Sequence, residues 1–249
     1  MESWREKALR WIFVAIFLAV IEVIVRLNLV DRIFLTSPSL IAVAAWDELF
    51  SGELPSLFLL TAYEVAIAFI VASIVGLCAG YALWRYPLLG RAYDELLGAL
   101  FASPLILLYP IFLVIFGRGI NAIIAMGSLY GMIPVVLNTH QGLRDVDQVY
   151  LKVGKGMRLS ERQILRHILF PAAWPMIIGG LKLGLTYILI SVIALEFLVD
   201  IGGVGTLASK GYFWFNTELL YLGVVGAILL SMVFVTLLGK AAARLLSRE

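Results

Sequence analysis

Six long apolar stretches constrain the fold of this chain more than any other feature of its sequence. They lie at about 11–29, 58–84, 95–116, 120–138, 171–199 and 219–239. A helix needs about 20 residues to cross the roughly 30 Å hydrocarbon core of a bilayer. Because each stretch approaches or exceeds that length, we predict an all-α integral membrane protein with six transmembrane helices.

The composition supports a lipid environment. Of the 249 residues, 62% are hydrophobic and 14% are charged, whereas about 25% of the residues of a soluble domain are charged. The first stretch follows basic residues, as in a signal peptide, but it contains Glu22 and Arg26 and lacks a small-residue cleavage site. We therefore expect a retained helix. Because no Pro-rich, Ser-rich or acidic linker divides the chain, we also expect a single transmembrane domain over residues 1–249.

Cysteine and histidine are too few to suggest metal or redox chemistry. Cys78 is the single cysteine, which excludes an internal disulfide, and the two histidines, His140 and His167, are far apart in the sequence. We expect no metal site.

The basic residues predict the orientation. Positive side chains near span ends are retained on the cytoplasmic side, and most of the 19 Lys and Arg residues fall in alternate segments, beginning with the N-terminal one. These residues are Arg5, Lys7, Arg10, Arg85, Arg91, Arg144, Lys152, Lys155, Arg158, Arg162, Arg166, Lys240, Arg244 and Arg248. We therefore expect both termini in the cytoplasm. On the other side, the amphipathic stretch Ser39–Leu49 predicts a short helix at the membrane surface.

The basic segment 139–170, between the fourth and fifth stretches, has helix signals of its own. Asp145, with Gln148 three positions later, predicts the cap of a first helix. Apolar residues then recur at spacings of three and four on one face of this helix: Val146, Val149, Val153 and Met157. Gly154 and Gly156 weaken its end.

A second helix is predicted to begin at Ser160. Ser160 and Gln163 fit a capping box, and Leu159 and Ile164 occupy the two positions of a hydrophobic staple. Two short amphipathic helices without a partner in their own chain suit docking into a groove of another protein. They equally suit the lipid headgroup region, with basic residues facing anionic lipid.

An ordered series of short motifs surrounds this segment. Its densest part is Ile168-Leu169-Phe170-Pro171, Gly180-Leu181-Lys182, Ala194-Leu195-Glu196 and Gly202-Gly203-Val204-Gly205-Thr206-Leu207. Upstream lie Leu35-Thr36-Ser37-Pro38, Ser103-Pro104, Pro110-Ile111-Phe112 and Phe116-Gly117. With this series the chain resembles the binding-protein-dependent ABC importer permeases of the type I fold. The resemblance is to the branch that serves nitrate, sulfonates and taurine, and also bicarbonate, aromatic acids and thiamine precursors.

The resemblance implies that segment 139–170 couples the permease to its ATPase. The residues expected to do so are Val149, Lys152, Val153, Gly154, Met157, Arg158, Ser160, Gln163 and Ile164. Two positions depart from the family pattern. Lys152-Val153-Gly154 stands in place of a Glu-Ala-Ala triplet, and Arg158 in place of a glycine.

The resemblance also implies the partners. We expect a permease subunit, not an enzyme, in the bacterial cytoplasmic (inner) membrane, paired with a second copy in a homodimer. ATPase subunits would bind ATP and Mg, a periplasmic or lipid-anchored binding protein would deliver a small, anionic solute, and nucleic acid would have no part. The residues agree that this chain binds no ATP, because neither Gly154-Lys155 nor Gly239-Lys240 is followed by the Ser or Thr of a phosphate-binding loop.

Polar residues within the apolar stretches are candidates for the translocation pathway. They are Ser103, Tyr109, Asn138, Thr186, Ser191 and Glu196. Small hydroxyls also serve helix packing. Lys182 can snorkel to the surface, and Glu196 can lie near the outer end of its helix. We expect Pro104, Pro110 and Pro134 to kink their helices.

Two other classes of function are weighed against the permease. An ion-gradient-driven secondary transporter or channel favours inverted repeats, and the sequence has no such symmetry. A membrane enzyme needs a converging cluster of reactive side chains, which the isolated histidines do not suggest.

Overall fold

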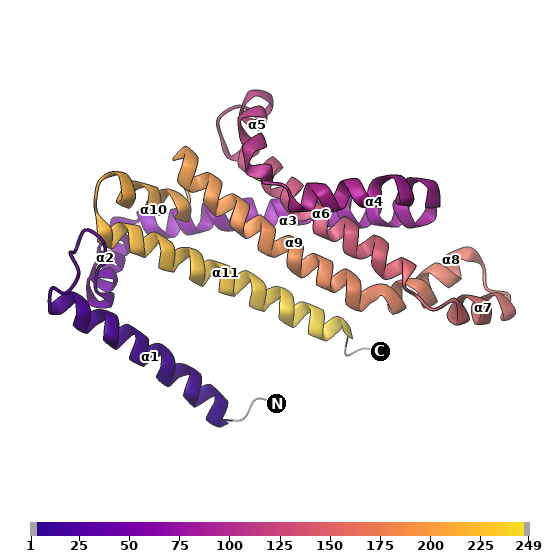
Figure 1. Ribbon diagram of the computed structural model, residues 1–249, viewed down its shortest axis with the longest axis horizontal. Helices are drawn as coiled ribbons and strands as arrows, with labels where there is room; N and C mark the ends of the chain where they lie inside the picture. Colours follow the sequence, from indigo (N-terminus) through magenta and orange to yellow (C-terminus); the bar gives the residue numbers. More distant parts are fainter. Residues whose placement is uncertain (1–3, 247–249) are drawn as a thin grey trace. The chain divides into compact units, whose positions relative to one another are not determined.

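The computed structural model describes residues 4–246, and every regular element among them is a helix (Figure 1). The chain divides into two compact units, residues 1–61 with 195–229 and residues 62–194 with 230–249. Three helices contribute to both units: α3 (Glu53–Arg85), α9 (Phe170–Val199) and α11 (Thr217–Leu246). Arg248, one of the basic residues used to predict orientation, lies outside the described residues.

Five helices of the described part of the chain are long and apolar enough to cross a membrane. They are Ala8–Arg26 within α1 (Trp4–Arg26), α3, α6 (Ile120–Arg144), the run Glu161–Val199 and Thr217–Arg244 within α11. These five helices correspond to five of the six predicted stretches. Most of them extend past the apolar residues, because a helix does not end where its hydrophobic segment ends.

The remaining stretch, 95–116, forms two helices instead of one. α4 (Pro87–Ala102) is followed by the 3₁₀ turn η1 (Leu105–Leu108) and α5 (Tyr109–Phe116), and the pair is bent by 91°. Ser103 is extended, with ψ 148°, because the residue before a proline is pushed out of the helical region. The chain therefore has six spans only if the bent pair counts as one.

The three prolines act differently from one another. Pro104 separates α4 from η1 and so breaks the helix. Pro110 lies in the first turn of α5, where its missing N–H costs nothing. Of these three prolines, Pro134 lies inside a helix, α6.

In the first unit, α2 (Pro38–Ser51) confirms the short helix predicted for Ser39–Leu49. The Ser37 side chain caps it by accepting from the Leu40 N–H, and Gly52 ends it at φ 82°. Glu22 ties α1 to α2, because its carboxylate accepts from the Ser39 N–H at 3.1 Å and from the Ser39 hydroxyl at 2.7 Å.

Helices of the second unit approach one another closely at glycine positions. A Cβ at Gly76 of α3 would lie 2.7 Å from the Cβ of Val135 in α6, and one at Gly184 of α9 would lie 2.8 Å from the carbonyl oxygen of Gly131 in α6. Small residues let membrane helices approach in this way, so that dispersion and backbone contacts hold them together in lipid. The surrounding core is fully buried: Val65, Ala68, Ile123, Met126, Ile188 and Val192.

Candidate functional site

The basic segment between α6 and α9 begins with a cap that differs from the predicted one. α6 continues to Arg144, and Asp145 ends it by donating its N–H to the carbonyl oxygen of Gln141. Asp147 caps α7 (Gln148–Gly156) instead, its carboxylate accepting from the Val149 N–H at 2.9 Å. The prediction that Asp145 caps this helix is wrong because α6 is longer than its apolar stretch.

The end of α7 explains why a glycine suits position 158. Leu159 donates its N–H to the carbonyl oxygen of Gly154 at 3.1 Å, and Arg158 donates its N–H to that of Lys155 at 3.0 Å. These two hydrogen bonds are the Schellman motif, which places one residue in the left-handed region. That residue is Arg158, with φ 55°. The motif thus survives the replacement of the family's glycine, at the cost of backbone strain.

The capping box predicted at Ser160 is confirmed. The Ser160 Oγ accepts from the Gln163 N–H at 3.3 Å, and the Gln163 Oε1 accepts from the Ser160 N–H at 2.8 Å. The helix that follows, α8 (Glu161–Ile164), runs through a π-helical segment, η2 (Leu165–Leu169), into α9. The second short helix of the prediction is therefore the first part of the fifth spanning helix.

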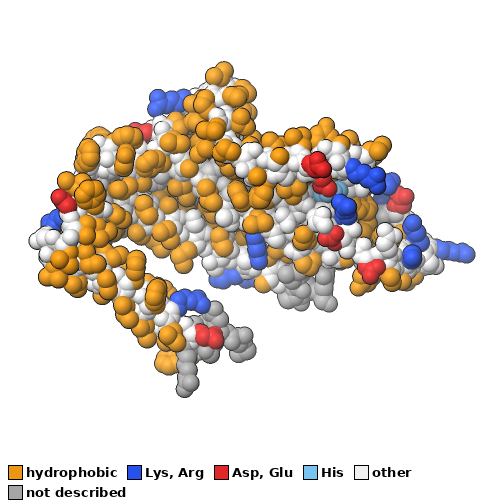
Figure 2. All heavy atoms as spheres, in the orientation of Figure 1, with side chains coloured by type: hydrophobic (Ala, Val, Ile, Leu, Met, Phe, Trp, Pro, Cys, Tyr) orange, Lys and Arg blue, Asp and Glu red, His pale blue; other side chains and the backbone are white. Residues whose placement is uncertain are grey.

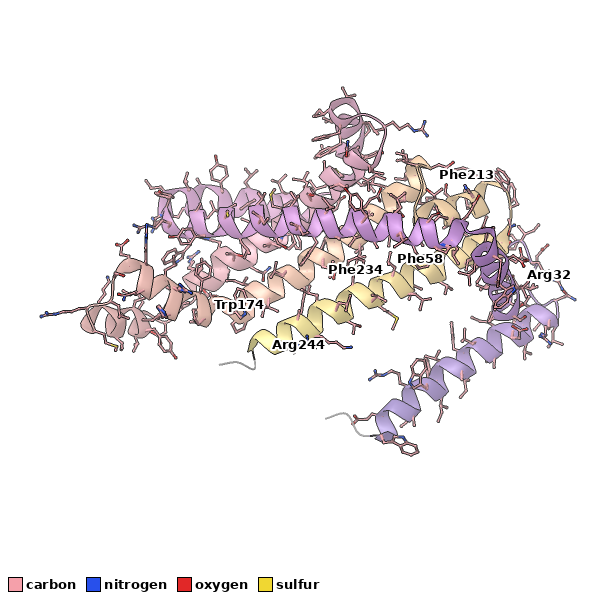
Figure 3. All side chains as sticks on the ribbon, turned by 180° about the vertical axis from the view of Figure 1, so that it is seen from behind. Arg32, Phe58, Trp174, Phe213, Phe234 and Arg244 are labelled. Atoms are coloured by element: carbon pink, nitrogen blue, oxygen red, sulfur yellow. The ribbon has the colours of Figure 1, made fainter. Side chains whose placement is uncertain are left out.

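A buried apolar cluster supports this segment from within its own unit. Its buried members come from α6, α8, η2 and α9: Leu143, Ile164, Leu169, Ala173 and Ile177. Leu159 and Trp174 pack against it, and Figure 3 labels Trp174 near this end of α9. Leu151 of α7 packs against the same cluster, so the expectation that the two short helices lack a partner in their own chain is wrong for both.

Gly154 brings α7 onto this cluster. A Cβ at Gly154 would lie 2.7 Å from the Cδ1 of Ile168 and 3.2 Å from the Cγ1 of Ile164. Both Gly154 and Ile164 are buried. Of the residues predicted to couple, these two therefore face inward and position α7.

A second face of α7, beside the one that carries Gly154, is apolar and exposed. Val149, Val153 and Met157 are 58%, 54% and 68% exposed, and Tyr150, at 57%, extends the same face. A pattern search restricted to aliphatic residues misses Tyr150. Lys152 is also exposed, and charged side chains gather around α7 and α8 in Figure 2. An apolar patch with a charged rim is typical of an interaction surface.

Ion pairs join the elements at the base of α7. The Asp94 carboxylate of α4 lies 3.5 Å from the Nε2 of His140 and 3.4 Å from the Nη1 of Arg144, both in α6. Arg85, at the end of α3, lies 3.2 Å from Glu161 of α8. The residues around Asp94 line a cavity of about 280 Å³ that extends to Gln148, the first residue of α7.

Sequence reasoning could not find these pairs. Asp94 and Arg144 are 50 residues apart, and Arg85 and Glu161 are 76 apart. No spacing rule connects residues at such separations.

Three pathway candidates in the second unit hydrogen-bond to the backbone of their own helix. The hydroxyls of Ser103 and Thr186 donate to carbonyl oxygens four residues earlier, at 2.7 and 3.0 Å. The Asn138 amide donates to the carbonyl oxygen of Pro134 at 2.8 Å. Hydrogen bonds of this kind are common for polar side chains in membrane helices. Ser191 differs, because it is 1% exposed and its hydroxyl has no hydrogen-bond partner among the described residues.

Tyr109 is buried, whereas Asn138 lines a cavity. Tyr109, the first residue of α5, is 7% exposed. Asn138 lines a cavity in the second unit with Asp94, Gln141 and Met176. The structure does not gather the candidates into one site, and their role in translocation stays a prediction.

Glu196 lies in the first unit and is fully buried. Its Oε1 accepts from the Thr61 hydroxyl at 2.6 Å, and its Oε2 accepts from the Gly205 N–H at 2.8 Å. Its carboxylate therefore binds neighbouring segments of the same unit. Lys182, by contrast, is exposed.

A comparison with protein families identifies the chain. Residues 72–249 match the family described as the binding-protein-dependent transport system inner membrane component. The chain belongs to this family. The match covers well over half of the chain and includes segment 139–170 and the Glu196 region.

Relatives of this permease carry several kinds of solute. The glycine betaine/carnitine/choline transport system permease protein OpuCD of Bacillus subtilis is 28% identical over 71% of this chain and 75% of its own length. The nitrate import permease protein NrtB of Synechocystis sp. is 31% identical over 67% of this chain and 62% of its own length. The putative aliphatic sulfonates transport permease protein SsuC of Bacillus subtilis is 25% identical over 85% of this chain and 76% of its own length.

Solved structures show the same fold. An inward-facing structure of the MetNI methionine ABC transporter matches with a TM-score of 0.67 at 20% identity, covering 81% of this permease and 98% of that chain. An amino acid ABC transporter matches with a TM-score of 0.59 at 14% identity, covering 80% and 95%. The fold is that of a type I ABC importer permease, as predicted.

Family and fold together establish the class of function. This permease is the transmembrane subunit of an ABC importer and a multi-pass protein of the inner membrane. It transports rather than catalyses, and it works with a separate ATPase and a substrate-binding protein. An ion-gradient-driven transporter and a membrane enzyme are therefore the wrong classes.

Proposed function

We propose that α7 is the element through which ATP hydrolysis in the ATPase drives solute import by this permease. The observation that carries the proposal is the exposed apolar face of Val149, Val153 and Met157 on a helix that is fixed at both ends. The Asp147 cap fixes its start, and the Schellman motif at Arg158 fixes its end. A rigid helix loses little entropy when it docks, so more of the contact energy appears as affinity.

Burial of this apolar face would contribute more to binding a partner subunit than the charges around it. Burying one of these side chains stabilises a complex by about 1.5–3 kcal/mol, whereas an exposed charge pair contributes about 0–1 kcal/mol. Lys152, which replaces the family's Glu, sits at the rim and would modify the contact rather than create it. The docking face would therefore work without the carboxylate.

The assembly that follows contains two copies of this permease and two ATPase subunits. ATP and Mg would be bound by the ATPase, since neither Gly-Lys pair of this chain continues into a phosphate-binding loop. A binding protein would deliver the solute. A homodimer predicts that tagged and untagged copies of this permease co-purify when they are expressed together.

The solute would be a small polar molecule, and an anion is the first class to test. Nitrate, sulfonates and bicarbonate appear in the names of relatives of this permease. Quaternary ammonium compounds, which OpuCD is named for, are the second class. Uptake of labelled nitrate or glycine betaine, with its cognate binding protein present, separates the two.

The test of the coupling role is Val153→Asp. This change puts a carboxylate without a counter-charge into the proposed interface. Keeping it buried there would weaken the complex by several kcal/mol. Val153 is exposed in the chain itself, so the variant should insert and fold normally. We expect it to lose co-purification of the ATPase and solute uptake together.

Two matched variants complete this test. Val153→Ala keeps the face apolar and should retain most of the association. Lys152→Ala should change little if the lysine is solvated, and should reduce coupling in part if it binds an acidic residue of the ATPase. Full assembly and wild-type uptake in Val153→Asp would show that α7 lies in the headgroup region instead.

A further inference from the structure

The turn between α9 and α10 (Val204–Phe213) has an irregular backbone with three residues at positive φ. Asp200, Gly202 and Gly203 have φ values of 54°, 133° and 91°. α10 has 10 residues, or about 15 Å of helix, which is half of the hydrocarbon core. It lies between two helices long enough to span. Non-helical backbone at membrane depth is tolerated only where protein or a water-filled cavity satisfies its polar groups.

Side chains satisfy three backbone N–H groups of this turn. Gly205 donates to the Oε2 of Glu196 at 2.8 Å, and Val204 donates to the Oγ1 of Thr61 at 2.9 Å. Gly202 donates to the Oγ1 of Thr206 at 3.1 Å. Donors at a helix start have no partner within the helix, so these contacts replace an ordinary cap. The residue at the cap position, Gly203, has no side chain with which to cap the helix.

Thr61 and Glu196 also bind each other. The Thr61 hydroxyl donates to the Oε1 of Glu196 at 2.6 Å, and both residues are 0% exposed. One hydroxyl and one carboxylate therefore join α3, α9 and the start of α10 within the first unit. We call this pair the α10 clamp.

Close packing against neighbouring helices of the first unit restricts the position of α10. A Cβ at Gly203 would collide with the Glu196 carboxylate, and one at Gly223 of α11 would lie 2.5 Å from the backbone N of Ala208 in α10. Phe58, labelled in Figure 3, lies on the α3 part of the same unit, where a Cβ at Gly226 would come within 2.9 Å of its ring. The start of α10 is thus held by the clamp, and its body is held by α11.

We propose that Thr61 and Glu196 are positioning residues for transport, which fix α10 as part of the barrier that solute must pass. The proposal rests on the importer function proposed above. Glu196 is then not a solute ligand, because its carboxylate oxygens bind the Thr61 hydroxyl and the Gly205 N–H. Thr61 contacts Glu196 across 135 residues of sequence and the Val204 N–H across 143. Loss of the clamp would let α10 move, so that solute leaks back and each ATP moves less of it.

The test compares Thr61→Val with Thr61→Ser in the reconstituted complex of permease, ATPase and binding protein. Valine has the shape of threonine but cannot hold the Val204 N–H or Glu196, whereas serine keeps the hydroxyl. We expect Thr61→Val to assemble and hydrolyse ATP, while solute moved per ATP falls several-fold. We expect Thr61→Ser to restore the ratio. This comparison separates the effect of the Thr61 hydroxyl from the effect of the size of the side chain.

A second readout follows α10 itself. Ser209 of α10 is 2% exposed, and Ser128 of α6, in the other unit, is 7% exposed. In a Cys78→Ser background, Ser209→Cys should react slowly with a membrane-impermeant thiol reagent. Adding Thr61→Val should speed that reaction on the order of tenfold, as the loss of a buried hydrogen bond would. Ser128→Cys should stay equally slow in both.

The outcomes are distinct. An unchanged ratio of solute to ATP and unchanged Ser209→Cys labelling in Thr61→Val would overturn the clamp. Faster labelling at both Ser209→Cys and Ser128→Cys would show general unfolding and would also overturn it. Failure of the wild-type permease to bind an ATPase would instead remove the proposed function and leave the Ser209→Cys labelling result standing.

Discussion

Arg158 holds a backbone conformation that strains any residue with a side chain. Its φ of 55° follows from the Schellman motif at the end of α7. The left-handed region costs an L-residue about 1–2 kcal/mol, and glycine enters it freely but loses more chain entropy on folding, about 0.5–1 kcal/mol. The balance favours glycine by a small amount.

We therefore expect Arg158→Gly to stabilise the permease by about 0.5–1 kcal/mol. The measurement is the midpoint of thermal unfolding in detergent, with ATPase association as a second readout. Arg158→Ala is the control, because it removes the same side chain and keeps the strain, so it should give no gain. A lower midpoint for Arg158→Gly than for Arg158→Ala would mean that the left-handed conformation is not the source of strain.

At the residue scale, a helix cap could be predicted where the capping residues lie at the actual start of the helix. Ser160 and Gln163 form the expected capping box, because both partners lie within one turn. Asp145 failed as a cap because α6 extends to Arg144, and hydropathy does not report where a helix leaves the membrane. Thr61 carried no signal at all, since its partners are distant in sequence.

Among the elements, α7 depends on how closely it approaches the cluster beneath it. Gly154 makes that approach, with Ile168 and Ile164 where its side chain would be. Gly156, two residues on, has nothing within 4 Å of such a position. The two glycines of one helix therefore have opposite tolerance for a side chain.

Gly154→Val should push α7 off its support and weaken ATPase binding, while Gly156→Val should leave it nearly unchanged. Overpacking of a well-packed site costs about 1–3 kcal/mol, which predicts about a fivefold to hundredfold loss of affinity if the cost falls on the docked state. Titration of purified ATPase onto the permease in nanodiscs measures it. Equal affinities for the two variants would contradict the role of Gly154 as the contact that seats α7.

At the scale of the elements, hydropathy and periodicity predicted some helices but not the contacts between them. Five spanning helices follow from apolar length alone, and α2 follows from its amphipathic pattern. The break at Pro104 was expected as a kink, because proline spacing does not reveal whether the chain resumes in the same direction. The ion pairs of Asp94 needed three-dimensional contact to be seen.

For the whole molecule, the number of crossings decides the sides on which the ends lie. Five helices can span, and the pair α4 and α5, bent by 91°, either crosses as a sixth or returns to the side it entered. Six crossings place both ends on one side, and five place them on opposite sides. The distribution of basic residues favours six.

Reporter fusions at the two ends test this directly. We expect an alkaline phosphatase fusion after Glu249 to be inactive and a fluorescent protein there to be bright, because both report a cytoplasmic end. A tag before Met1 should give the same result, and a tag in the segment at 30–36, before α2, should be accessible from outside. Ends on opposite sides would mean that α4 and α5 form a re-entrant hairpin.

The π-helical segment η2 controls the direction in which the docking face points. In η2 the Phe170 N–H donates to the carbonyl oxygen of Leu165, five residues back, so the segment holds one residue more than a regular turn. Each residue of an α-helix advances the side chains by about 100° around the axis. The extra residue therefore rotates α8, and with it α7, by roughly a quarter turn relative to the spanning part of α9. A chain shortened by one residue here would keep every helix and aim its coupling face at the wrong partner surface.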